Sequence, residues 1–314
     1  MEQLNDDLDL LNSIVRDADD NPSDYRATGE SRWSTYSDRT LQHLRTKGLK
    51  DFRKPGVLPN HFGATDKNPD PQRASSVDLF HSARSCFTGR SAKRLEELPA
   101  SNVGNPEGFF IEGAFYTLSW LNYYCRYAFV SNFFDFDNQV IVEIGPGCGK
   151  QAEMLKKAHP NLTIILFDLP TQIYVTDRYL SKLFSGTGEI AGYSECRSMK
   201  HFREIKRGKI NIFPHWKFPI IQNMEFDLLW NAASFQEMAA DTSKQYINSS
   251  SKARNFYLMY NIKYRGLSFH PGYSGIINAA HIKSHYEHYR ESAHLALTPA
   301  QWLYFDSFWK QSQD

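Results

Sequence analysis

A chain of 314 residues, 41% hydrophobic and 14% aromatic, can bury one sizeable core and is longer than a minimal α/β domain needs. Its formal net charge of +1, from 36 basic and 35 acidic residues, provides no global field that would collect nucleic acid or an anionic membrane. Four cysteines without CxxC spacing, an acidic amphipathic start and no apolar run near the ~18 residues of a membrane span predict a reduced, cytoplasmic protein.

The first third of the chain predicts a mainly helical and irregular extension over residues 1–107. Loop-forming clusters such as DDNPSDY and KPGVLPNHFG separate short apolar pieces there. The basic stretch RTLQHLRTKGLKDFRK has helical spacing interrupted by Gly48, which is typical of a solvated helix face rather than a phosphate-binding surface.

The chain becomes aromatic from Gly108 onward. The segment GFFIEGAFYTLSWLNYYCRYAFVSNFFDF has large residues at nearly every helical position, which predicts a helix from about Phe109 to Phe129, buried on most sides. We expect this helix to cover a sheet or to line a pocket. Tyr116 and Tyr123 are the rings that we assign to the pocket, because their hydroxyl groups need partners when buried. Ordinary core packing is the alternative for both rings.

Four short apolar runs follow, and each has the length and composition of a buried strand. They are NQVIVEIG, LTIILFDLP, KINIFPHW and FDLLWNAASF, and segments of helical composition separate them. This alternation predicts a parallel sheet covered on both faces by helices. We therefore predict an α/β fold with a Rossmann-like, doubly wound and mostly parallel sheet. Residues 138–235 should form the ligand-binding half of this sheet, within a domain of residues 108–314.

A glycine-bearing turn follows the first predicted strand. Gly145, Gly147 and Gly149 would let backbone N–H groups approach a ligand without intervening Cβ atoms. Asp168 ends the second predicted strand, close to the ~20-residue offset at which an acid accepts hydrogen bonds from a ribose diol. The pattern therefore predicts a nucleoside-containing ligand. His215, after the third strand, either abuts the adenine or is a structural histidine.

Three features select among nucleoside cofactors. The spacing is G-x-G-x-G rather than G-x-G-x-x-G, no Lys-Ser/Thr pair is present for a triphosphate, and Glu143 lies on the strand just before the turn. These features favour S-adenosylmethionine over a dinucleotide or ATP.

The segment VEIGPGCGKQAEML, followed by FDLP, resembles the first two motifs of class I S-adenosylmethionine-dependent methyltransferases. With SRWSTYSDRTLQHLRTKGLKDFRK, GNPEGFF, DLPTQIYVTDRYLSKLF and FDLLWNAASFQEM, the chain resembles the bacterial sugar O-methyltransferase family over roughly residues 31–240. The resemblance implies methyl transfer from S-adenosylmethionine to a hydroxyl of a sugar or sugar-bearing metabolite. The residues that we assign to the cofactor are Glu143, Gly145, Gly147, Gly149, Asp168, Leu169 and Asn231.

Methylation of a hydroxyl needs a group that removes its proton, because the pKa of a sugar hydroxyl is far above 7. Glu237 is our first candidate, since it follows the fourth predicted strand, whose carboxyl end should open onto the ligand crevice. Asn231 and Ser234 in the same loop could bind cofactor or acceptor, and Gln236 could hydrogen-bond a polyol. The alternative for Glu237 is a first-turn helix carboxylate that interacts with the macrodipole, worth ~0.3–1 kcal/mol.

Histidines near the carboxyl terminus offer a second base. The segment NAAHIKSHYEHYRESAH would set His281, His285 and His288 on one face of a helix, and we assign His281 as the alternative base. Zinc on this helix, or Mg²⁺ between Glu237 and Asp241, are minority alternatives, and we predict no metal.

Two other function classes remain open from the sequence. An N-methyltransferase acting on an amino sugar or a peptide amine would need no strong base, and a non-catalytic binding module would have lost the cofactor. We expect a small-molecule acceptor, enclosed between the aromatic helix and the segment from His270 to Trp309, and no nucleic-acid or membrane partner. A homodimer is an open alternative.

Overall fold

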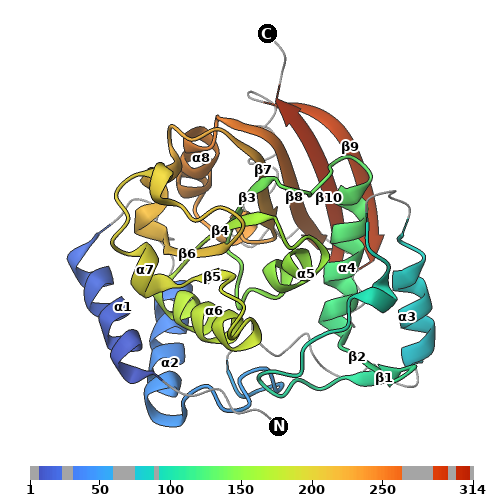
Figure 1. Ribbon diagram of the computed structural model, residues 1–314, viewed down its shortest axis with the longest axis horizontal. Coiled ribbons are helices and arrows are strands. Elements are labelled where there is room, and N and C mark those ends of the chain that lie inside the picture. The colour runs from blue at the N-terminus through green and yellow to red at the C-terminus, as the bar shows by residue number, and fades with distance from the viewer. Residues whose placement is uncertain are drawn as a thin grey trace.

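The centre of the protein is an eight-stranded sheet. The computed structural model describes residues 7–22, 31–58, 75–87, 92–263, 286–295 and 302–311. The strands of this sheet are β3 (Val140–Ile144), β4 (Thr163–Asp168), β5 (Ile190–Ala191), β6 (Ile210–Pro214), β7 (Phe226–Ala232), β8 (Ala253–Lys263), β9 (Tyr286–Leu295) and β10 (Trp302–Gln311). Their spatial order is β5-β6-β4-β3-β7-β8-β10-β9 (Figure 1). The first six strands of this order are parallel, and β10 is antiparallel to both β8 and β9.

The four strands predicted from the sequence are confirmed as β3, β4, β6 and β7. All five residues of β3 are buried, as expected for a central strand with a parallel neighbour on each side. The chain moves from β3 to β4 on one side and reaches β7 on the other, so the winding reverses at β3. The predicted class, a mostly parallel doubly wound α/β sheet with a helical N-terminal region, is therefore correct.

Helices cover the sheet on both faces. The α-helices are α1 (Leu8–Asp20), α2 (Ser31–Lys47), α3 (Ser76–Arg84), α4 (Leu118–Ser131), α5 (Lys150–Ala158), α6 (Pro170–Leu183), α7 (Tyr193–Cys196) and α8 (Ala240–Ser249). Short 3₁₀ turns are η1 (Leu95–Glu97), η2 (Phe202–Glu204), η3 (His215–Ile221) and η4 (Phe235–Glu237). None of the helices in the described ranges is long and apolar enough to cross a membrane.

The alternation of side chains along β3 separates two apolar layers. Ile141 belongs to a cluster that includes residues of α1, α2, α4, α5 and α6. Val142 belongs to a second cluster that includes residues of α7, η3 and α8. Because successive strand residues point to opposite faces, a residue two positions from Ile141 shares the α4 side of the sheet.

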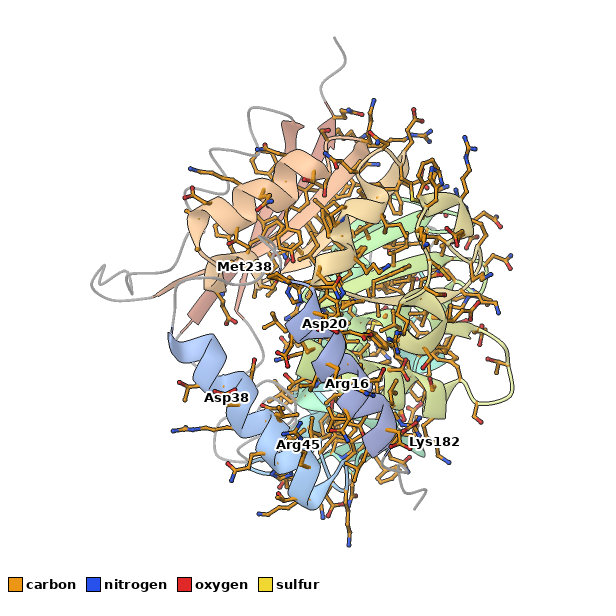
Figure 2. The ribbon with its side chains drawn as sticks, turned by 90° about the vertical axis from the view of Figure 1, so that its left-hand side faces the viewer. Arg16, Asp20, Asp38, Arg45, Lys182 and Met238 are labelled. Carbon is orange, nitrogen blue, oxygen red and sulfur yellow. The ribbon has the colours of Figure 1, made fainter. Side chains whose placement is uncertain are left out.

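The N-terminal helices contribute to the same core as the sheet. Leu11 and Ile14 of α1 are fully buried in the cluster that contains Ile141. Buried Arg53 donates from Nη1 to the carbonyl oxygen of Ser101 at 2.8 Å. Figure 2 shows α1 and α2 next to each other on this side of the molecule. The boundary between residues 107 and 108 stays a prediction.

The helix predicted from about Phe109 to Phe129 is wrong in its first part. The chain forms a hairpin there, with strands β1 (Phe109–Ile111) and β2 (Ala114–Tyr116), and α4 begins only at Leu118. The two turn residues, Glu112 and Gly113, have φ of 50° and 81°. Two consecutive left-handed residues close a two-residue hairpin whose twist suits the paired strands. The helical spacing of the aromatic residues does not indicate this turn.

The predicted helix that carries the histidines is also contradicted. Residues Tyr286–Leu295 form the edge strand β9, in which His288 is paired with Trp309 of β10. His281 and His285 lie outside the described residues. Cross-strand pairing with a distant segment overrides the local helical spacing here.

Replacing Leu11 by Ala should destabilise the whole fold. The substitution leaves a cavity between α1 and the shared core, so we expect a loss of about 2–5 kcal/mol in the free energy of unfolding, measured by urea denaturation. Leu8→Ala, at a position 47% exposed on the same helix, is the control and should cost less than about 0.5 kcal/mol. An unchanged main transition in Leu11→Ala would mean that α1 unfolds separately.

Candidate functional site

The turn between β3 and α5 places all three glycines in the left-handed region. Gly145, Gly147 and Gly149 have φ of 75°, 63° and 85°. A Cβ atom on Gly145 would stand 2.4 Å from the Cβ atom of Ser234, so only glycine lets the turn after β7 come this close. A Cβ atom on Gly147 would meet nothing within 4 Å. The loop is therefore packed against protein at Gly145 and faces open space at Gly147.

Asp168 lies beside this loop at the end of β4. Its Oδ2 accepts a hydrogen bond from the Gly147 N–H at 3.0 Å, and its Oδ1 accepts one from the Leu169 N–H at 2.7 Å. Burial raises the pKa of Asp168 to about 7, the two N–H groups lower it, and the charge of Glu237 raises it further. The loop backbone thus fixes a carboxyl group that changes its charge near neutral pH.

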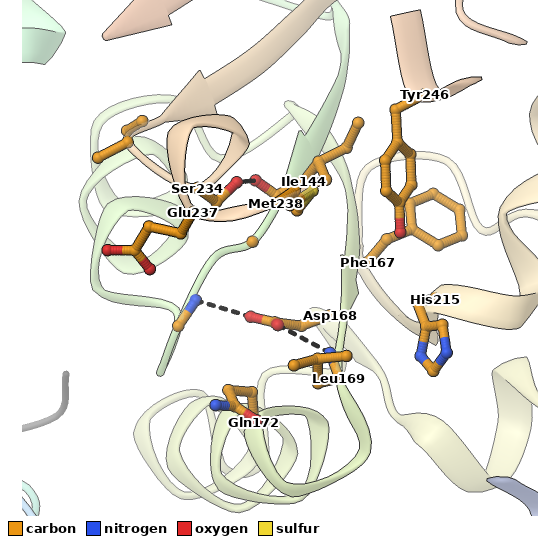
Figure 3. A pocket seen from close by; sticks show the side chains of 14 residues that line it. Ile144, Phe167, Asp168, Leu169, Gln172, His215, Ser234, Glu237, Met238 and Tyr246 are labelled. Atoms are coloured by element: carbon orange, nitrogen blue, oxygen red, sulfur yellow. Dashed lines mark hydrogen bonds between the residues drawn. The ribbon is translucent and has the colours of Figure 1, made fainter. Parts of the chain in front are cut away.

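A cavity of about 180 Å³ opens at the carboxyl ends of β3, β4 and β7 (Figure 3). This is the point where the winding of the sheet reverses, and such points are where open α/β sheets bind ligands. The residues that line it are Ile144, Gly145, Gly147, Phe167, Asp168, Leu169, Gln172, His215, Ala232, Ala233, Ser234, Glu237, Met238 and Tyr246.

Much of the cavity wall is apolar or aromatic. Phe167 and Leu169 come from β4 and the residue after it, whereas Tyr246 comes from α8. His215, 5% exposed, begins η3 and completes this part of the wall (Figure 3). A flat apolar ring could bind there, with Asp168 at its polar edge.

Sequence reasoning missed Gln172, Met238 and Tyr246 in the wall. Gln172 lies in the first turn of α6, just after the FDLP segment. Its closeness to Asp168 in the sequence could have indicated that it lies at the same end of the sheet. No local pattern indicates Met238 or Tyr246, because the folding of η4 and α8 back over the cavity brings them there.

Asn231 ties β7 to β3 at the rim of the cavity. Its fully buried Nδ2 donates to the Ile144 carbonyl oxygen at 3.0 Å, and its Oδ1 accepts from the Phe235 N–H at 3.1 Å. Ser234 Oγ donates to the same carbonyl oxygen at 2.8 Å. Between them, Ala233 has a φ of 71°, which is unfavourable for a residue with a Cβ atom. The side chain of Asn231 therefore positions this turn, and its direct contact with a cofactor stays a prediction.

Glu237 ends η4, and its side chain lines the cavity together with Asp168 (Figure 3). The charge of Glu237 is one cause of the raised pKa of Asp168, so the two carboxyl groups in the cavity wall interact electrostatically. Their combined field disfavours an anionic ligand and favours a cationic one. Because η4 is only a single turn, the macrodipole alternative for Glu237 has little dipole to act on.

The second metal alternative fits this geometry poorly. The side chain of Asp241 is 98% exposed, and its Oδ1 lies 3.7 Å from the Lys244 Nζ. Across the described ranges, no group of three His, Cys, Asp or Glu side chains is placed to hold a metal ion.

Glu143 lies on β3, on the same side as Ile141 and α4. It is 3% exposed, and its Oε2 has no hydrogen-bond partner in the part of the chain that the structure describes. Burial raises the pKa of Glu143 to about 8, the charge of Arg126 lowers it, and the charge of Asp168 raises it. Glu143 is therefore a buried carboxyl group within electrostatic reach of the cavity.

Two other buried side chains near the glycine loop also have polar atoms without a hydrogen-bond partner among the described residues. Trp230 is the cross-strand neighbour of Glu143 on β7, and Gln151 lies in the first turn of α5. Among the described residues, neither the Trp230 Nε1 nor the Gln151 amide has a hydrogen-bond partner. Each such group costs ~1–3 kcal/mol when unsatisfied, and neither residue is part of the cavity wall.

The structure does not bring every predicted residue to this cavity. Tyr116, 1% exposed, packs edge-on against Phe80 with ring centroids 4.9 Å apart, as a core residue does. Tyr123 lies on α4, with the Lys150 Nζ 5.5 Å from its ring centroid. Gln236 is 4% exposed. Tyr116, Tyr123 and Gln236 are not part of the cavity wall, nor are three of the residues assigned to the cofactor, Glu143, Gly149 and Asn231. His281 lies outside the described residues.

Comparisons with known proteins identify similar solved structures only. No protein-family model and no curated protein matches the chain. The magnesium protoporphyrin IX methyltransferase of Synechocystis PCC 6803 with bound SAH is 8% identical, with 62% of this chain and 84% of that chain covered and a TM-score of 0.43. M. capricolum TrmK in complex with S-adenosyl-homocysteine is 11% identical, with 59% and 66% covered and a TM-score of 0.37. At such values, function must be inferred from the residues of this chain.

Glu143→Gln should flatten the pH dependence of stability. The pKa of Glu143 in the folded protein is about 8, above its usual value of 4.5, so its contribution to stability is full below pH 4.5 and is lost as the pH rises through 8. The amide cannot ionise, so the urea midpoint of the variant should fall less than that of the wild type between about pH 6 and about pH 9.

The exposed Glu225, with 72% of its side chain accessible, provides the control for this experiment. Glu225→Gln should follow the wild-type profile. If Glu143→Gln also followed it, the folded protein would not carry an uncompensated carboxyl group at Glu143.

Proposed function

We propose that this protein is an S-adenosylmethionine-dependent methyltransferase that acts on a hydroxyl of a sugar or a sugar-bearing small metabolite. The observation that supports this choice of cofactor is a pair of buried carboxyl groups at the glycine loop. Asp168 lies beside the loop, and Glu143 lies on the strand before it. Gly147 leaves open space next to Asp168, and the Oε2 of Glu143 has no partner among the described residues. These features fit a ligand that has both a ribose and a cationic group.

Asp168 would hold the nucleoside half of the cofactor. Each of its oxygens accepts one backbone N–H, which leaves a further lone pair for a ribose hydroxyl. Phe167, Leu169 and Tyr246 supply the apolar surface that an adenine ring needs. His215 is placed at the edge of the same wall.

Glu143 would accept from the amino group at the other end of the cofactor. A positive partner stabilises the ionised carboxylate and offsets its burial. A dinucleotide or ATP offers no such partner, because a negative phosphate chain at this loop would raise the pKa of Asp168 and Glu143 further. The electrostatics therefore support the cofactor that the spacing of the glycines favours.

Glu237 is the residue that we propose as general base. The bound cofactor supplies an electrophilic methyl carbon, so the chain must position the acceptor hydroxyl and remove its proton. The cavity wall contains two carboxyl groups, and Glu237 is the one that is not assigned to the ribose. His281 remains the alternative base, and Gln236 and Tyr123 remain proposed acceptor contacts outside the cavity described above.

A sugar acceptor is supported by the resemblance of residues 31–240 to sugar O-methyltransferases. An N-methyltransferase acting on an amine is the second candidate, because the raised pKa of Asp168 and Glu143 suits a cationic cofactor equally well for either acceptor. A non-catalytic module would retain the fold without the cofactor. The acceptor can be identified by incubating the protein with labelled S-adenosylmethionine and a metabolite extract of the cells that produce it. The acceptor is the metabolite that gains the mass of one labelled methyl group.

Asp168→Ala should weaken cofactor binding. The loss of a charged acceptor for the ribose, worth ~1.5–3 kcal/mol, corresponds to a roughly ten- to hundredfold higher Kd for S-adenosylmethionine by calorimetry. Asp241→Ala, at a side chain 98% exposed, is the control and should bind like the wild type. If the wild type itself showed no binding, the chain would be a module without cofactor. Equal affinity of Asp168→Ala and wild type would remove Asp168 from the ribose site.

Glu237→Gln should distinguish the two methyl acceptors. With a hydroxyl acceptor, removal of the base should lower kcat by about 10²–10⁴-fold, whereas an amine that binds in its neutral form should lose much less. Cofactor affinity should fall less than in Asp168→Ala, because the substitution keeps the size of the side chain and removes a charge but none of the proposed hydrogen bonds to the ribose. Full turnover of a hydroxyl acceptor by Glu237→Gln would contradict its role as base.

A further inference from the structure

Two cysteine side chains meet between α3 and α4. The Sγ atoms of Cys86 and Cys125 lie 3.1 Å apart, although the residues are 39 positions apart in the chain. Both residues are half-buried, whereas Cys148 and Cys196 are fully buried. Contact with a second thiol and partial access to solvent therefore distinguish this pair from the other cysteines.

The two sulfur atoms are already close to bonding distance. The S–S bond is about 2.05 Å long, so the sulfur atoms must move together by about 1 Å. Cys86 lies two residues beyond the end of α3, in a turn rather than inside the helix. Its Sγ is 3.8 Å from the Ser82 carbonyl oxygen, which is a weak contact. The α3 side can therefore supply the movement, while Cys125 is held within α4.

We propose that Cys86 and Cys125 form a redox modification site, at which a disulfide oxidant of the glutathione class closes an intramolecular disulfide. The site joins α3 to α4, which lie near one another at the edge of the molecule (Figure 1). It uses no residue of the cofactor site and does not depend on the methyl-transfer reaction.

The exchange proceeds in two balanced steps. The Cys86 thiolate attacks one sulfur of oxidised glutathione, which forms a mixed disulfide and releases one glutathione thiolate. Cys125 then loses its proton to solvent, and its sulfur attacks the Cys86 sulfur and releases the second glutathione. Two protein thiols are oxidised, and one glutathione disulfide is reduced to two thiols. Cys86 is the sulfur that reacts first, because it lies in the turn after α3, whereas the hydrogen bond with Cys86 and burial raise the pKa of Cys125 within α4.

Closure would restrain the helix that covers β3. The new bond closes a loop that contains η1, β1, β2 and the first turns of α4. Arg126 follows Cys125 directly, and its charge acts on Glu143. The oxidised protein should therefore have a higher Tm, by about 5 °C or more, because the bond lowers the entropy of the unfolded chain.

The test uses the full chain, oxidised glutathione and intact mass measured after alkylation under denaturing conditions. We expect the mass loss of two hydrogens, protection of two of the four thiols from alkylation, and a peptide that links Cys86 to Cys125. Dithiothreitol should reverse the mass change and the rise in Tm together.

Matched variants separate this site from nonspecific oxidation. Cys125→Ser should stop at a glutathione adduct on Cys86, and Cys86→Ser should show neither adduct nor disulfide. Cys196→Ser, at a buried thiol, should still form the Cys86 to Cys125 bond. A wild-type protein that carried only glutathione adducts, or that lost no thiols, would overturn the proposal.

Discussion

The burial of β3 between two helical layers is the constraint on which the site depends. Every residue of this strand is buried, and the chain beyond it turns at the carboxyl end of the strand into the loop that leads to α5. Glycines at positive φ make that turn and admit the turn after β7, which Asn231 holds against the Ile144 carbonyl oxygen. A cavity is left between the ends of three parallel strands. The packing of the central strand thus determines where a ligand can bind.

The same burial gives the site its electrostatic character. Asp168 and Glu143 have pKa values raised to about 7 and about 8, because each carboxyl group is removed from water without a cation that fully compensates it. Such an arrangement costs stability in the unliganded protein at alkaline pH and prepares the site for a positively charged ligand. Binding and stability are therefore expected to oppose each other at these two residues.

Helix α4 connects this site to the N-terminal part of the chain. Its Trp120 Nε1 donates to the Leu98 carbonyl oxygen at 2.7 Å, and its Tyr127 hydroxyl accepts from the Lys93 N–H at 2.8 Å. The same helix places Arg126 near Glu143 and Cys125 near Cys86. A change in the packing of α3 against α4 would therefore alter the position of Arg126 relative to Glu143 on β3.

The features that short-range patterns specify could be predicted from the sequence. These are the four apolar strands, the glycine turn and the acid at the end of β4, because each depends on residues within one βαβ unit. Only the tertiary structure decided that Tyr116 is a core residue, that residues 286–295 form a strand, and that Met238 and Tyr246 reach the cavity. It also decided which buried polar atoms lack a hydrogen-bond partner among the described residues, and that the thiols of Cys86 and Cys125 lie in contact. These properties depend on contacts between segments far apart in the chain, and no local periodicity contains that information.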